Sequence, residues 1–118
     1  MDVENFREYC LSLPFVTEEI PFDGVTPVYK VAGKMFALLS LDDYDSWVGL
    51  KCDPERAIDL REHYPEDILP GYHMNKRHWN SVRLLGNLTD SMIREMTKDS
   101  YGLVVAGLPG KAKEMLKG

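Results

Sequence analysis

Cysteine and long apolar runs are both scarce in this sequence. Only two cysteines occur, Cys10 and Cys52, and no apolar run approaches the roughly 18 residues needed to cross a bilayer. The two cysteines lack metal-ligand spacing, which favours free thiols in a reducing cytosol, with a disulfide as the alternative. The segment from Met1 to Glu4 is acidic and is not followed by an apolar core, unlike a signal peptide. We therefore expect a cytoplasmic protein that makes no use of a membrane.

Motifs of the common enzyme classes are also missing. The sequence contains no G-x-S-x-G, no phosphate-binding loop, no dinucleotide fingerprint and no C-x-x-C. Cys52 could pair with His63, His73 or His78 as a nucleophile and base, but no local signature joins them. We therefore expect no enzymatic activity, no catalytic residues and no cofactor.

Two clusters have metal-ligand chemistry without completing a metal site. Asp42, Asp43 and Asp45 could hold a hard cation, but their loop lacks the ligand count and the terminal bidentate glutamate of a calcium loop. His73 and His78 have no further soft ligand near them, whereas a structural zinc site needs four ligands. A solvated turn and two hydrogen-bonding histidines are the favoured interpretations, so we expect no metal site.

The size and the charge of the chain limit which other classes of protein it can belong to. A chain of 118 residues with 44% hydrophobic and 28% charged residues is typical of one soluble domain, here spanning 1–118. The net charge of −5 argues against wholesale coating of nucleic acid or of an anionic membrane. Any contact with nucleic acid must therefore be local.

The pattern of apolar residues predicts three helices. The first follows a cap at Asp2 and ends at Pro14, the second runs from the Asp53-Pro54 start to Tyr64, and the third opens at Thr89-Asp90 and ends before Pro109. Each has apolar side chains at three- and four-residue spacing, which forms one buried stripe. The residues 111–117 are expected to form a short basic tail.

Strands are predicted on both sides of the second helix. An extended segment over 17–22 precedes strands over 28–31, 35–41 and 47–52, and a further strand covers about 78–85. Gly33 supplies the positive φ of a tight hairpin between the first two strands. The order is helix, three-stranded meander, helix, one or two strands, long helix. We therefore predict an α+β domain of two layers, an antiparallel sheet with its helices on one face.

One interval of this acidic chain carries no acidic residue. Between Asp67 and Asp90 the sequence holds three cations together with His73, His78 and Trp79. Cations neutralise phosphate, and a mixed basic and aromatic segment of this kind could contact a nucleic acid. The alternative is the start of a strand, with Trp79 packed in the core and the cations in solvent. The candidate contacts are Lys76, Arg77, His78, Asn80 and Arg83, with Lys30 and Lys34 on the neighbouring hairpin.

The run His73-Met-Asn-Lys-Arg-His-Trp-Asn-Ser-Val82 resembles the signature of the MmcQ/YjbR family of small bacterial proteins. Leu88-Thr-Asp90, Ser100-Tyr-Gly-Leu-Val104 and Thr17-Glu-Glu19 agree with that resemblance, which covers essentially the whole chain. It implies a secretion-chaperone-like α+β fold with the order helix, three strands, helix, two strands, helix. It also implies DNA binding through a "double wing", in which projecting hairpins flank a helix.

Two functions remain open at this point. The favoured one is a DNA-binding protein that contacts phosphate through residues 73–83 and the neighbouring hairpin, with Trp79 mainly structural. The other is a protein-interaction or chaperone-like module with no nucleic-acid role, which would use an apolar sheet face or the long C-terminal helix.

Overall fold

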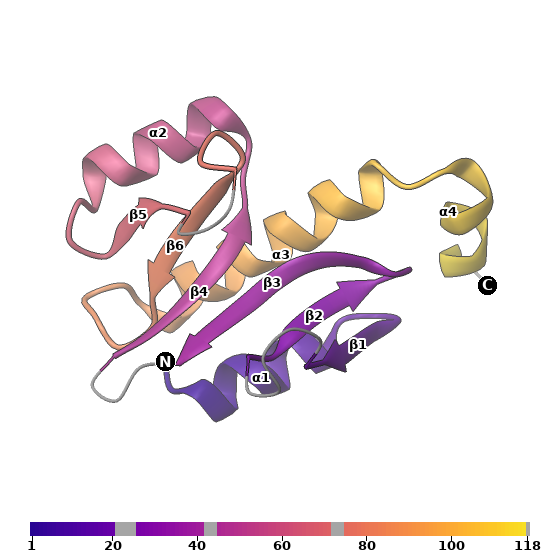
Figure 1. The fold of residues 1–118 in the computed structure, drawn as a ribbon, viewed down its shortest axis with the longest axis horizontal. Helices are drawn as coiled ribbons and strands as arrows, with labels where there is room; N and C mark the ends of the chain where they lie inside the picture. Colours follow the sequence, from indigo (N-terminus) through magenta and orange to yellow (C-terminus); the bar gives the residue numbers. More distant parts are fainter. Residues whose placement is uncertain (21–25, 42–44, 72–74, 118) are drawn as a thin grey trace.

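The computed structural model describes residues 1–20, 26–41, 45–71 and 75–117 (Figure 1). Its helices are α1 (Val3–Ser12), α2 (Pro54–His63), α3 (Asp90–Ala106) and α4 (Gly110–Lys117). Its strands are β1 (Val16–Glu19), β2 (Val28–Val31), β3 (Lys34–Leu41), β4 (Ser46–Lys51), β5 (Ile68–Pro70) and β6 (Trp79–Arg83). None of the helices in these ranges is both long and apolar enough to span a membrane.

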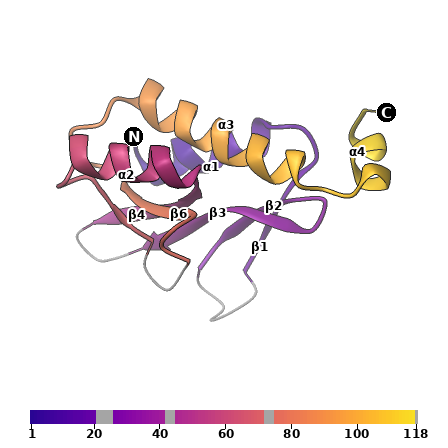
Figure 2. The same cartoon turned by 90° about the horizontal axis from the view of Figure 1, so that it is seen from above.

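The strands form one antiparallel sheet with the order β1-β2-β3-β4-β6-β5. Helices α1, α2 and α3 lie on one face of this sheet, and α4 lies beyond one end of it (Figure 2). The predicted α+β fold with two layers is therefore confirmed.

The structure corrects the prediction at two places. Residues 16–19 form the edge strand β1, paired with β2, where the sequence indicated only an extended segment. The expected basic tail is the helix α4, in which the Lys113 amide donates to the Pro109 carbonyl at 3.1 Å. The long helix α3 ends before Pro109, as predicted. A new helix can nevertheless begin directly after Pro109, because proline is well tolerated at the start of a helix, where no intrahelical partner awaits its nitrogen.

Local chemistry accounts for the element boundaries. Asp2, Asp53 and Thr89 each accept hydrogen bonds from backbone amides in the first turn of the helix that follows, as predicted. Ala32 and Gly33 have φ of 50° and 78°, the two positive values that a two-residue type I′ hairpin requires. This hairpin places Lys34 directly at the start of β3.

The core lies between the sheet and the helices. Its residues come from the covered face of the sheet and from one stripe each of α1 and α3, and they include Phe6, Cys10, Tyr29, Phe36, Leu39, Val48, Leu50, Val82 and Ile93. Burying apolar surface of this kind contributes about 25 cal/mol per Å². The opposite face of the sheet carries the alternate residues of each strand, among them Trp47, Lys51, Trp79 and Arg83.

Candidate functional site

The strand register brings two basic turns to the same end of the sheet. Ala37 of β3 pairs with Leu50 of β4, which in turn pairs with Asn80 of β6. Lys34 precedes Ala37 in β3, and Arg77 precedes Asn80 and the start of β6. Because β3 and β6 are both antiparallel to β4, they run in the same direction, so Lys34 and Arg77 lie toward the same end of the sheet. The end of β4 lies between them. We define the basic end of the sheet as Lys34, Lys51, Lys76 and Arg77.

The turn before β6 is held by hydrogen bonds within its own backbone. The Asn75 carbonyl accepts from the amides of His78 at 3.2 Å and Trp79 at 2.9 Å, and the Asn75 side chain accepts from the Arg77 amide at 2.9 Å. The side chains of Lys76 and Arg77 are exposed. The turn therefore fixes the backbone while leaving both cations in solvent.

Helix α2 anchors the same turn from behind. Arg61 donates through Nε to the Asn80 side chain at 2.7 Å and through a second guanidinium nitrogen to the Lys76 carbonyl. The Asn80 amide group donates to the Ala57 carbonyl at 3.5 Å, and Asn80 is 2% exposed. Asn80, a predicted contact, is therefore buried between β6 and α2, where it positions the turn.

Arg83, another predicted contact, is paired with carboxylates on the face of the sheet opposite the core. Its Nε donates to the Asp45 carboxylate at 3.0 Å, and its NH1 lies 3.5 Å from Asp67 Oδ1. Its guanidinium also lies 4.6 Å from the centre of the Trp47 ring. Two carboxylates thus neutralise this cation, and Arg83 joins β4 to the β5–β6 hairpin.

The remaining predicted residues are likewise either bonded to other parts of the protein or exposed. Lys30 pairs with Glu19 across β1 and β2, with Nζ 2.8 Å from the carboxylate. Lys34 is exposed, and His78 is half-buried with its carbonyl accepting from the Cys52 amide at 2.7 Å. Within the described ranges, neither Lys34, Lys76 nor Arg77 forms an ion pair.

The other chemical candidates find structural roles or lie outside the described residues. His73, Asp42 and Asp43 belong to the second group. Asp45 accepts from the Trp47 indole at 3.0 Å, in addition to Arg83. No group of three or more histidine, cysteine, aspartate or glutamate side chains could hold a metal ion in the part of the chain that is described.

Lys51 was not among the residues selected from the sequence. It is the last residue of β4, and its partner in the register is Trp79. The only sequence signal was its place at the end of a predicted strand, which does not reveal that this end lies between two basic turns. The register makes Lys51 the central cation of the basic end.

Comparison with known proteins supplies the family. The YjbR family model matches residues 11–103, most of the chain. The chain belongs to the YjbR family. It is 36% identical to the uncharacterized Escherichia coli O157:H7 protein YbdF, covering 97% of this chain and 93% of YbdF. It is 32% identical to the uncharacterized Escherichia coli K12 protein YjbR, covering 98% of each chain.

Solved structures share the fold of this YjbR-family chain. The crystal structure of the Deinococcus radiodurans protein DR2400 matches with a TM-score of 0.90 and 37% identity, covering 98% of this chain and 87% of DR2400. A crystal structure of a Pseudomonas syringae protein matches with a TM-score of 0.74 and 26% identity, covering 87% of this chain and 98% of that one. The residues matched by the YjbR model include the whole basic end.

Proposed function

We propose that this YjbR-family protein binds duplex DNA by contacting phosphate oxygens through the basic end of the sheet. The observation that supports the proposal is a contrast among the cations that the sequence predicted to contact DNA. Arg83 and Lys30 are neutralised by carboxylates, whereas Lys34, Lys76 and Arg77 are exposed and form no ion pair with any described residue. Unpaired cations gathered at one end can displace counterions from a DNA backbone.

The spacing of the two basic turns suits a DNA groove. One strand, β4, separates β3 from β6, so these two strands are about 10 Å apart where they pair with it. The twist of the sheet fans their tips further apart (Figure 1). Turns set further apart than the strands could contact phosphates on the two sides of the major groove of B-DNA, which is about 12 Å wide.

Because the protein carries a net charge of −5, we expect contact with DNA to be limited to the basic end. Four cations, Lys34, Lys51, Lys76 and Arg77, would give a log–log dependence of affinity on salt with a slope of about −3 to −4. Asn80 and Arg83 would support the site by holding the turn and the β5–β6 hairpin, and His78 would lie at its margin. Contacts to phosphate alone carry no sequence information, so the proposed binding is of low sequence specificity.

The test is fluorescence anisotropy of a labelled duplex of about 20 base pairs at low salt, long enough to cover the proposed contacts. The variant Lys76→Ala/Arg77→Ala should bind more weakly and with a slope shallower by about 2. The control Arg94→Ala/Lys98→Ala removes the same charge from exposed positions of α3, on the helix side of the sheet, and should retain most of the affinity. Equal losses of DNA affinity in the two variants would show that affinity depends only on the net charge of the protein, and would reject the proposed site.

A further inference from the structure

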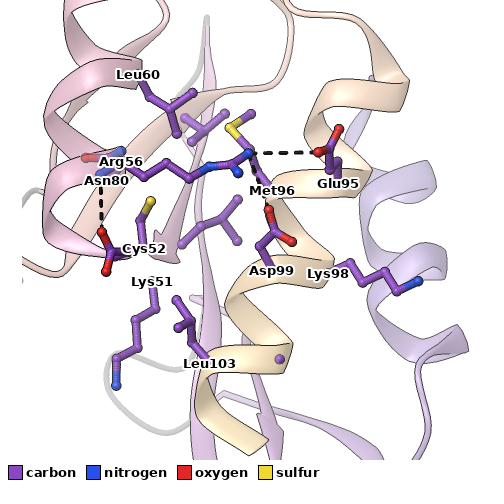
Figure 3. A pocket seen from close by; sticks show the side chains of 14 residues that line it. Lys51, Cys52, Arg56, Leu60, Asn80, Glu95, Met96, Lys98, Asp99 and Leu103 are labelled. Atoms are coloured by element: carbon purple, nitrogen blue, oxygen red, sulfur yellow. Dashed lines mark hydrogen bonds and ion pairs between the residues drawn. The ribbon is translucent and has the colours of Figure 1, made fainter. Parts of the chain in front are cut away.

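A cleft of about 610 Å³ opens between α2 and α3, above β4 and β6 (Figure 3). Its apolar lining comes from Leu50, Leu60, Val82, Met96 and Leu103. A volume of this size lies within the range of clefts that hold small molecules, and such clefts typically combine apolar walls with a few polar groups. Of the four cations proposed to contact DNA, only Lys51 also lines this cleft.

The cleft exists because its two walls are fixed to the sheet separately. On the α3 side, the Ser100 hydroxyl donates to the Phe36 carbonyl at 2.6 Å and accepts from the Lys51 amide at 2.8 Å. On the α2 side, the Asn80 side chain bonds to both Arg61 and Ala57. These buried polar contacts hold each helix in place without closing the space between them.

The charged groups at the mouth of the cleft do not balance. Arg56 reaches from α2 to α3, where its guanidinium lies 3.4 Å from Asp99 and 3.9 Å from Glu95 (Figure 3). Lys51 and Lys98 also line the cleft, but their side chains point away from it (Figure 3). Asp53, a third carboxylate, also lines the cleft. Three carboxylates therefore lie with one cation, Arg56, around the mouth, which leaves an excess of negative charge beside an apolar floor.

We propose that the cleft binds a small organic cation, an amine with an apolar body. The apolar body would lie on Leu50, Val82 and Met96, and the ammonium would pair with Asp99 or Glu95 at the mouth. A monocation reduces the excess negative charge at the mouth, whereas an anionic head group would add to it.

The Arg56 side chain has the same chemistry as the proposed ligand. It is a cation on an aliphatic stem, extended across the cleft toward the same two carboxylates. The pairs are partly exposed and are therefore weak, so a ligand can take one carboxylate while Arg56 keeps the other. Arg56 thus tolerates ligand entry, and each of the two cations can then keep one carboxylate of α3.

The test compares three probes with the same apolar chain: n-octylamine, n-octanol and n-octanoate. Each is titrated at neutral pH into ¹⁵N-labelled protein to millimolar concentration, below micelle formation, and the amide shifts are followed by NMR. We expect octylamine to shift the amides of Cys52, Gly102 and Leu103 and to bind about two- to fivefold more tightly than octanol. Octanoate should bind most weakly. Octanoate binding as tightly as octylamine, or shifts confined to other surfaces, would overturn the proposal.

Matched variants separate the ion pair from general apolar binding. Glu95→Gln/Asp99→Asn should remove the preference for octylamine over octanol, whereas the control Glu62→Gln/Glu66→Gln, an equal change of charge at exposed α2 and loop positions, should retain it. Gly102→Leu should fill the cleft and weaken all three probes, since open space surrounds a side chain added at Gly102. An unchanged preference in Glu95→Gln/Asp99→Asn would overturn the assignment of the carboxylates.

Discussion

Arg83 is expected to stabilise the fold without contacting DNA, which makes Arg83→Met a decisive substitution. Methionine keeps the aliphatic stem but removes the guanidinium that links Asp45, Asp67 and Trp47. The Asp67 side chain is only 7% exposed, so its carboxylate would lose its cation while remaining buried. Asp67 keeps one hydrogen bond, from the Asn87 amide at 3.3 Å.

The expected loss of stability depends on how deeply the two members of the Arg83–Asp67 ion pair are buried. Breaking a buried ion pair costs about 3–5 kcal/mol, and an exposed one costs less than about 1 kcal/mol. The Arg83 side chain is 34% exposed and Asp67 is nearly buried, which places the pair between these limits. Loss of the contact with Trp47 adds about 0.5–1 kcal/mol. We expect Arg83→Met to lower the free energy of unfolding by about 2–4 kcal/mol.

Urea unfolding followed by tryptophan fluorescence measures this loss, because Trp47 lies against the altered side chain. Arg83→Met/Asp67→Asn should recover part of it, since a neutral amide leaves no buried charge. DNA affinity of the folded Arg83→Met protein should remain close to that of the parent protein. A variant that keeps its stability within about 0.5 kcal/mol but loses DNA affinity would refute the structural role of Arg83.

Three further outcomes are expected. Gly102→Ala should raise the free energy of unfolding by about 0.5–1 kcal/mol in thermal unfolding, because Gly102 lies within α3 and open space surrounds an added Cβ; a loss of stability would contradict this. The hydrogen bond from Arg7 holds the pKa of Glu18 below its ordinary value, so Glu18 stabilises the protein above about pH 4.3 and less as pH falls toward the folded-state pKa. Glu18→Gln should therefore flatten the acid limb of the stability profile, and an unchanged limb would exclude that contribution. Burial raises the pKa of Cys52, so iodoacetamide should alkylate it at neutral pH more slowly than free cysteine, measured by mass spectrometry; an equal rate would contradict that shift.

Helices α1, α2 and α3 and the first hairpin could be predicted because their signals are local. Asp53-Pro54 and Thr89-Asp90 mark helix starts by capping chemistry that acts within one turn, and Gly33 marks a turn by its own φ. The strand β1 is only four residues long, too short for its alternation to distinguish it from a loop. Its identity depends on pairing with β2, which local patterns do not report.

The site was harder to predict because ion pairs join distant residues. The sequence shows Arg83 in an interval free of acidic residues, yet Asp45 reaches it from 38 positions away across β4 and β6. Lys30 is likewise neutralised through the pairing of β1 with β2. The cleft between α2 and α3 depends on where two helices lie on the sheet, which no local pattern encodes.

The salt dependence of DNA binding tests the central claim most directly. Anisotropy of the labelled duplex should be measured with the parent protein at several salt concentrations, from low to physiological ionic strength. Contact through the four cations of the basic end predicts binding at low salt and a log–log slope of about −3 to −4. The absence of binding at low salt and micromolar protein, or a slope near zero, would contradict the account.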